Sequence, residues 1–138
     1  MRVFLDTNVI MDTLITGRPS SETSTKLIGQ ANLDEIRFSI SSLSIADAVY
    51  SCRKEYSREE LLKSIDIIMK KWRVLPLSEW NIYDALKSTC PDFEDALQIA
   101  IAEGDADVIV TNNTRHFKGH TALEVVTPQE FLDRISAD

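Results

Sequence analysis

Short apolar runs alternate with longer amphipathic stretches along the 138 residues of the chain. A short apolar run suits a strand that is buried on both faces of a parallel sheet, and an apolar stripe at helical spacing suits a helix packed on that sheet. The pattern predicts strands at residues 2–5, 36–40, 73–77, 108–110 and 123–126. This alternation predicts a three-layer α/β/α sandwich with a central parallel sheet of about five strands.

About seven helices are predicted between and after these strands. Serine, proline or aspartate precedes several of them, as is common at helix starts, and Gly104 ends one. We expect helices at residues 9–14, 23–31, 43–54, 57–71, 79–87 and 91–102, and a last one that begins at Pro128. No repeat or linker interrupts the pattern, so we expect one domain over residues 1–138.

The composition narrows the class of protein. Hydrophobic residues make up 43% of the chain and charged residues 27%, which are ordinary values for a globular domain. We expect a cytoplasmic protein with no membrane span and no signal peptide, because the apolar runs are short and no basic segment opens the chain. Cys52 and Cys90 have no metal-ligand spacing, so we interpret them as core or surface thiols rather than a disulfide.

The net charge of −7 argues against a broad phosphate-binding surface, because such surfaces depend on clustered lysine and arginine. It does not exclude nucleic acid as a ligand. A cluster of carboxylates that holds a divalent cation reverses its own local charge and can then bind phosphate through the metal.

Polar residues follow two of the predicted strands at the point where each strand ends. Asp6 comes directly after the first strand, and Thr111, Asn112 and Asn113 come directly after the fourth. The carboxyl ends of parallel strands share one edge of the sheet, which is where open α/β sheets keep their ligand sites. Asp47 and Asp95 lie near the starts of helices that can reach the same edge.

Each of these residues also has a structural interpretation. Asp92 and Asp95 stand three residues apart, a spacing that suits an N-cap and an acid in the first helical turn, and spacing alone favours this capping role. Asn8 is a good N-cap for the helix that follows it, a role compatible with support of Asp6. Asp12 lies further into that helix and is expected to be exposed.

Asp47 is harder to explain as a surface acid. Leu43, Ala46 and Tyr50 surround it along the predicted helix, so Asp47 lies at the border of the apolar face, where an acid is usually paired or functional. Asp107 precedes the fourth strand by enough residues to lie at the opposite edge of the sheet, ~13 Å from Thr111 at ~3.3 Å per residue.

Five segments in order resemble the PIN domain, and within it the VapC-like toxin ribonucleases and their close relatives. They are FLDTNV at residues 4–9, SSLSIAD at 41–47, DFEDALQ at 92–98, VIVTNN at 108–113 with Phe117, and TPQEF at 127–131. Each segment is weak evidence alone, and their common order over the whole chain makes chance similarity improbable.

The resemblance implies a PIN-like α/β/α fold and a metal-dependent endoribonuclease, the toxin of a type II toxin–antitoxin pair. Asp6, Asp47 and Asp95 match the acids that hold Mg²⁺ or Mn²⁺ in the family, with Thr111 and Asn8 beside them. Oxygen ligands suit such hard cations, and the metal activates water for attack on an RNA phosphodiester. The partners implied are RNA, an antitoxin protein and a second copy of the chain.

The chain departs from the family pattern at two positions. The second acid is commonly glutamate and here is Asp47, although some branches of the family use aspartate. The fourth position is often aspartate and here is Asn113, a neutral amide that should weaken a second metal site. Asp92 and Glu94 are the nearby acids that could compensate.

Two other hypotheses stand beside this one. The first is a catalytically weak or inactive PIN-like module that binds RNA or a partner protein. The second, a phosphoacceptor fold, is excluded because the required acidic pair, lysine or second acid is absent from the sequence. Arg115, His116 and Lys118 follow Asn113 and are candidates for RNA contact, or else belong to a solvated loop. Neither the RNA target, the number of metals nor the oligomeric state follows from the sequence.

Overall fold

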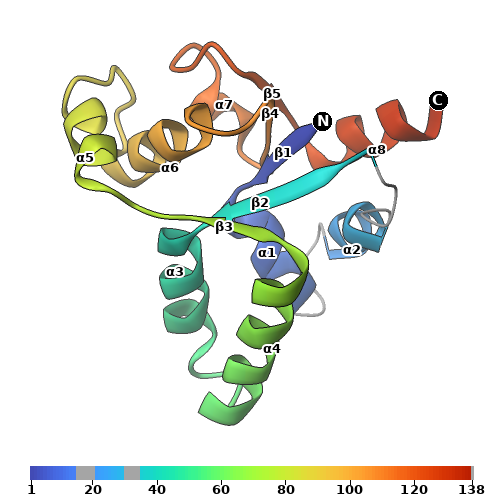
Figure 1. Ribbon diagram of the computed structural model, residues 1–138. Coiled ribbons are helices and arrows are strands. Elements are labelled where there is room, and N and C mark those ends of the chain that lie inside the picture. Colours follow the sequence, from blue (N-terminus) through green and yellow to red (C-terminus); the bar gives the residue numbers. More distant parts are fainter. Residues whose placement is uncertain (15–20, 30–34, 138) are drawn as a thin grey trace.

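Five parallel strands form the central sheet of the computed structural model, which describes residues 1–14, 21–29 and 35–137 (Figure 1). The strands are β1 (Arg2–Leu5), β2 (Arg37–Ser41), β3 (Arg73–Leu75), β4 (Val108–Val110) and β5 (Glu124–Val126). Their order across the sheet is β3-β2-β1-β4-β5, and every neighbouring pair is parallel. The predicted α/β architecture is confirmed.

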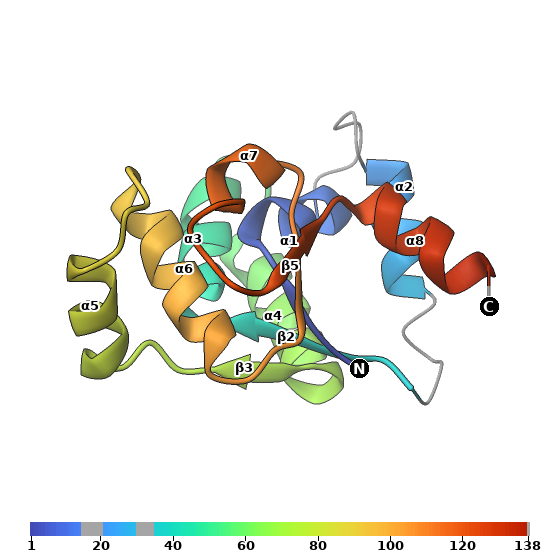
Figure 2. The same cartoon turned by 90° about the horizontal axis from the view of Figure 1, so that it is seen from above.

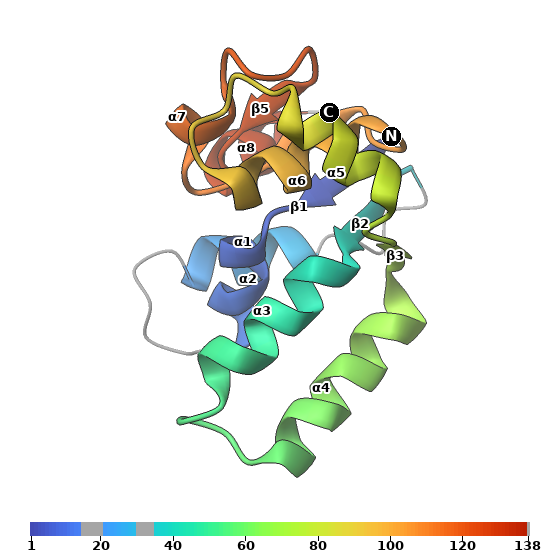
Figure 3. The same cartoon turned by 90° about the vertical axis from the view of Figure 1, so that its left-hand side faces the viewer.

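Helices cover both faces of this sheet, as the view from above shows (Figure 2). On one side lie α5 (Glu79–Leu86), α6 (Phe93–Glu103) and the short α7 (Thr114–Phe117), and on the other lie α1 (Thr7–Leu14), α2 (Ser21–Gly29) and α8 (Pro128–Ala137). The helices α3 (Ser42–Cys52) and α4 (Arg58–Lys71) form a hairpin that extends away from the sheet (Figure 3). Two apolar clusters fill the spaces between the layers, which explains the near-continuous burial of the strands.

The central strands contribute side chains to both clusters in alternation. Phe4 and Ile109 pack with α5 and α6, whereas Val3, Leu5 and Val108 pack with α1, α2 and α8. All five side chains are almost completely buried. This two-sided burial is why the strands at the centre of the sheet have uninterrupted apolar runs.

The strand order places a topological switch point between β1 and β4. From β1 the chain adds β2 and β3 on one side, and later adds β4 and β5 on the other. The crevice at the carboxyl ends of such a pair is the usual ligand site of an open α/β sheet. Asp6 follows β1 here, and its backbone N–H donates to the carbonyl of Val110 at 3.0 Å. Asp6 and Thr111 therefore meet at this crevice.

The buried face of α3 differs from the one expected from the sequence. Ser44, Ala48 and Cys52 face the interior, while Ala46 is exposed and Tyr50 is 66% exposed. The prediction was wrong because it counted apolar side chains, and Ser44 is instead buried with its hydroxyl hydrogen-bonded. Tertiary partners outweighed hydrophobicity along this helix.

Asp12 was also wrongly expected to be exposed. It is only 1% exposed, and Ser24 and Asn112 donate hydrogen bonds to its Oδ2 at 2.9 and 2.8 Å. These donors come from α2 and from the turn after β4, so no local pattern announces them. The predicted helix at residues 23–31 is α2, whose described part ends at Gly29; residues 30 and 31 lie outside the described residues.

Cys52 and Cys90 are both free and buried, which confirms the prediction that they are thiols in the core rather than a disulfide. Within the described ranges, we find no helix with the length and apolar character that a membrane crossing requires.

Candidate active site

Asp6 lies at the bottom of the crevice between β1 and β4. Thr111 and Asn8 donate hydrogen bonds to its Oδ2 at 2.8 and 2.9 Å, and the backbone N–H of Thr7 donates to Oδ1 at 2.8 Å. The residue is 6% exposed. Three donors from two strand ends therefore hold this carboxylate in a fixed orientation.

The surroundings of Asp6 disfavour its charged form. The pKa of Asp6 is raised to about 6: burial and, to a smaller extent, the negative charge of Asp95 raise it, while the hydrogen bonds from Thr111, Thr7 and Asn8 lower it. A carboxylate that is desolvated beside another acid is typical of a functional site, because burial of this kind costs stability.

Asn8 joins the two strand ends rather than capping a helix. It is the second residue of α1, so the predicted N-cap role was wrong. Its Nδ2 donates to Asp6 and lies 3.4 Å from Thr111 Oγ1, and its Oδ1 accepts from the backbone N–H of Asn112 at 3.2 Å. Asn8 and Thr111 thus support Asp6 in the way that the resemblance implied.

The start of α6 brings further acids to this edge. Asp92 is the N-cap, and its Oδ1 accepts from the backbone N–H of Asp95 at 2.9 Å, as the spacing predicted. Asp95 is half-buried and lies 3.4 Å from Nδ1 of His116. Burial and the charge of Asp92 raise the pKa of Asp95, and His116 opposes this effect. Asp92 is therefore the N-cap and Asp95 the acid in the first turn of α6, as the structural interpretation predicted.

Asp47 faces a second acid, Glu94. Contact with the side chain of Asp47, together with burial and the negative charges of Asp47, Asp92 and Asp95, raises the pKa of Glu94 to about 7. Asp47 Oδ2 is buried and has no hydrogen-bond partner among the residues that the structure describes. The sequence suggested Glu94 only as a compensating acid. Its position in the first turn of the helix that carries Asp95 was the feature from which its place at this edge could have been predicted.

The donor chemistry of this edge fits a hard divalent cation, although the ligands do not converge as one group. Carboxylate and hydroxyl oxygens are what Mg²⁺ and Mn²⁺ prefer, and a buried Asp47 oxygen without a partner is suited to bind one. Asp6 lies near Asp95, and Asp47 near Glu94. Across the described ranges, however, no three His, Cys, Asp or Glu side chains are close enough together to form a ligand set.

A cavity of about 320 Å³ opens beside Asp95 and provides room for a substrate group. Arg115, His116 and His120 line it together with Asp92, so two of the three residues predicted to contact RNA lie there. Lys118, the third, lies instead toward Glu130. The pKa of Glu130 is lowered mainly by hydrogen bonds from Thr127 and to a smaller extent by the positive charge of Lys118.

Asn113 is close to these groups in the chain but takes little part in their contacts. It is exposed at the start of α7, and its side chain makes no cap hydrogen bond there. Its backbone N–H donates to Thr111 Oγ1 at 3.1 Å. Asn113 therefore helps to orient Thr111 through its backbone, whatever its side chain is.

Comparisons with known proteins bear on the fold of the chain. The family model described as "PIN domain" matches residues 2–115. A comparison with curated protein sequences gave no significant match.

Solved structures of similar fold cover nearly the whole chain. VapBC-1 from nontypeable Haemophilus influenzae matches with a TM-score of 0.70 and 20% identity, covering 94% of this chain and 99% of that one. VapBC2 from Rickettsia felis, bound to a DNA fragment from its promoter, matches with a TM-score of 0.69 and 20% identity, covering 92% of this chain and 98% of that one. VapC20 from Mycobacterium tuberculosis, described as a sarcin–ricin loop cleaving toxin, matches with a TM-score of 0.69 and 13% identity, covering 88% of this chain and 98% of that one. At these identities the likeness shows the fold.

Proposed function

The chain belongs to the PIN domain family, and from this premise we propose that it is a metal-dependent endoribonuclease, the toxin of a type II toxin–antitoxin pair. The observation that carries the proposal is the gathering of like charges at the carboxyl edge. Asp6 is desolvated beside Asp95, and Asp47 meets Glu94; among the described residues, the basic side chain that pairs with one of these acids is the exposed His116, beside Asp95. Such an arrangement is unfavourable for the fold alone and is explained by a cation.

Asp6, Asp47 and Asp95 would hold Mg²⁺ or Mn²⁺ in this proposal. The bound ion supplies an activated water and neutralises charge on the scissile phosphate. Thr111, Asn8 and the backbone of Thr7 keep Asp6 oriented, since each donates to its carboxylate. Asp92 holds Asp95 at the start of α6 through the N-cap.

Glu94 would supply the negative charge that Asn113 lacks. Its position beside Asp47 supports this, because it brings a further carboxyl group next to a proposed ligand. In the same proposal, Arg115 and His116 bind the RNA backbone, since both line the cavity beside Asp95. Lys118 is less well placed for this, because it lies toward Glu130.

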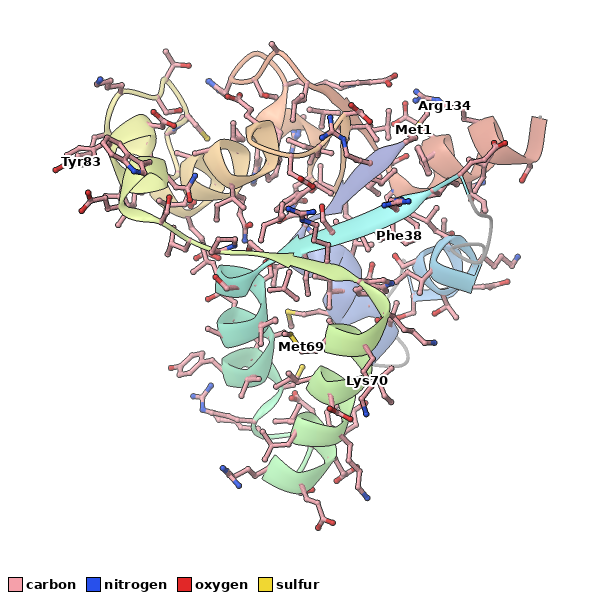
Figure 4. The ribbon with its side chains drawn as sticks, in the orientation of Figure 1. Met1, Phe38, Met69, Lys70, Tyr83 and Arg134 are labelled. Carbon is pink, nitrogen blue, oxygen red and sulfur yellow. The ribbon has the colours of Figure 1, made fainter. Side chains whose placement is uncertain are left out.

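Protein partners are proposed on two grounds. Three of the solved structures of similar fold are VapBC complexes or are described as DNA-bound VapBC, which supports an antitoxin partner. Large apolar side chains are also exposed on α5, where Tyr83 extends outward (Figure 4) and Trp80 and Leu86 are 70% and 68% exposed. A homodimer would double the 15.6 kDa mass of the chain, which light scattering would detect.

The test of the enzymatic proposal is RNA cleavage with Mg²⁺ or Mn²⁺ by matched aspartate variants. Asp6→Asn and Asp95→Asn should each lose about 100-fold or more of the activity, as expected when a charged group that stabilises the transition state is removed. Asp107→Asn is the control, because Asp107 is exposed and pairs with Arg2. Equal activity in all four proteins would reject the site.

A second function, an RNA-binding or partner-binding module without hydrolysis, is favoured by one observation. The acids of the described residues form two contacts rather than one set of ligands. This module would bind RNA without Mg²⁺ or Mn²⁺, and its binding would be unchanged in Asp95→Asn. Gel-shift titration in the presence of a chelator, run beside the cleavage assay, separates the two functions.

A further inference from the structure

A buried polar network connects α1, which follows Asp6, with α3 and α6, which carry Asp47 and Asp95. Its centre is Gln98 of α6, which is 1% exposed although its neighbours in the helix, residues 96–97 and 99–102, are apolar. The Ser41 hydroxyl donates to Gln98 Oε1 at 2.7 Å, and Gln98 Nε2 donates to Ser44 at 3.0 Å and to Thr7 at 3.2 Å. The side-chain amide is therefore satisfied on both its oxygen and its nitrogen.

The partners of Gln98 also contact one another. Thr7 Oγ1 and Ser44 Oγ lie 2.7 Å apart, and Ser41 Oγ lies 3.0 Å from Ser44 Oγ. Ser41 is the N-cap of α3 and accepts from the backbone N–H of Ser44. A fully paired, buried network of this kind fixes the relative placement of the elements that it joins, because a shift of any one leaves a buried polar group unpaired.

Each member of the network lies close in the chain to one of the three acids. Thr7 follows Asp6 directly, and Ser44 lies one helical turn before Asp47. Gln98 lies one turn after Asp95, so it projects from the same side of α6. The network thus joins α1, α3 and α6 behind the acids, and it reaches Asp6 through the backbone N–H of Thr7, which donates to Asp6 Oδ1 at 2.8 Å.

We propose that Gln98 is a positioning residue, which sets the separation of Asp6, Asp47 and Asp95 by holding α1, α3 and α6 together through Thr7, Ser41 and Ser44. The inference rests on the proposed function, since it concerns the acids that would hold the metal. It assigns to Gln98 no contact with the metal or with RNA. Its loss should therefore weaken metal binding and leave the KM for RNA unchanged.

The test uses Gln98→Met, which keeps the side-chain length and removes the hydrogen bonds. Calorimetric titration with Mn²⁺ should show about 10-fold or more weaker binding, as is usual when the groups that orient metal ligands are lost. The control is Ile101→Val or Ile101→Ala in the same helix, whichever matches the loss of Tm in Gln98→Met. Ile101 is buried in the apolar cluster against α5 and makes none of these hydrogen bonds. The control should bind Mn²⁺ as the wild type does.

A second pair of variants keeps the test decisive if Gln98→Met does not fold. Thr7→Val removes one hydroxyl of the network with almost no change of shape, and Thr13→Val makes the same change further along α1, where the hydroxyl donates to Ile10 O. Weaker Mn²⁺ binding in Thr7→Val than in Thr13→Val supports the proposal.

Three outcomes are distinguishable. Equal Mn²⁺ affinity in Gln98→Met, its Tm-matched control and the wild type would overturn the role of Gln98 while leaving the proposed function standing. A higher KM for RNA with unchanged Mn²⁺ affinity would overturn it also, since Gln98 would then act on the substrate. Absence of Mn²⁺ binding in the wild type would overturn both proposals.

Discussion

Acidic residues have neighbours of opposite charge at the two edges of the sheet. At the amino edge, acids meet arginines: Asp107 lies 3.2 Å from Arg2, and Asp105 lies 3.7 Å from Arg73. At the carboxyl edge, acids meet acids, and Asp6 is almost completely buried there. The same side-chain type therefore contributes to the fold at one edge and works against it at the other.

The pKa values of the acids are shifted in opposite directions at the two edges. Hydrogen bonds from Arg2 lower the pKa of Asp107, whereas burial raises the pKa of Asp6 to about 6. An acid that is kept in an unfavourable environment is a candidate for function, while a paired surface acid is explained by structure alone. The difference is our reason, independent of any relative, for proposing the carboxyl edge as the functional edge.

The largest expected effect comes from Asp47, the acid in α3. Asp47→Asn should reduce metal-dependent RNA cleavage by about 100-fold, because it removes one proposed ligand charge. Asp105→Asn at the amino edge should change the rate less than about two-fold, since a surface ion pair contributes little. Initial rates on one RNA substrate at saturating Mn²⁺ measure both. A comparable loss in the two variants would remove the functional distinction between the edges.

The next effect concerns stability and has opposite signs at the two edges. The difference between a pKa of about 6 and an ordinary aspartate value near 4 corresponds to about 3 kcal/mol against folding at neutral pH. Asp6→Asn removes this cost but weakens the hydrogen bonds to the carboxylate, so we expect a net gain of about 1–2 kcal/mol. Asp107→Asn should lower stability slightly.

Thermal unfolding at pH 7.5 without divalent ions measures this pair of variants. The expected rise in Tm for Asp6→Asn is about 3–6 °C for a domain of this size. A fall in Tm for Asp6→Asn would mean that Asp6 stabilises the fold, as Asp107 does.

The pH dependence sharpens the same comparison. The unfolded chain loses the Asp6 proton near pH 4 and the folded chain near pH 6, so the unfavourable contribution of Asp6 is complete above pH 6 and vanishes below pH 4. The advantage of Asp6→Asn over the wild type should therefore shrink as the pH falls from 7 to 4.5. Urea unfolding at several pH values tests this, and a constant difference would contradict the buried-acid explanation.

The smallest expected effect is a gain in Mn²⁺ affinity when Asn113 is replaced by aspartate. Asn113→Asp restores the acid that is common in the family and should strengthen Mn²⁺ binding by several-fold at most, because the position is exposed. Lys118→Met, which changes a nearby charge that lies toward Glu130, is the control. Mn²⁺ titration monitored by calorimetry compares them. A much larger gain would show that Asn113, rather than the rest of the edge, limits the site.

Much of the fold could be predicted because its signals are local. The apolar runs before Asp6 and Thr111 predicted β1 and β4, and the Asp92 N-cap was predicted from a three-residue spacing. The meeting of Asp6 and Thr111 followed from the geometry of parallel strands. These properties depend on neighbours in the chain or on rules that every parallel sheet obeys.

The remaining features could not be predicted because they depend on partners far away in the sequence. Asp12 is buried because Ser24 and Asn112 pair with it, and Ser44 faces the interior because Gln98 pairs with it. The inner face of α3 was therefore misassigned. A polar residue in a predicted core position is best interpreted as a network member whose partners remain to be found.

The central claim is that the like-charged acids of the carboxyl edge hold a divalent cation, and Mn²⁺ binding measured by electron paramagnetic resonance tests it most directly. Free Mn²⁺ is titrated with wild type, Asp95→Asn and Asp107→Asn, each confirmed to be folded. The account predicts that wild type and Asp107→Asn bind Mn²⁺ alike and that Asp95→Asn binds it about 10-fold more weakly or worse. Equal binding by all three proteins, or none by the wild type, would contradict it.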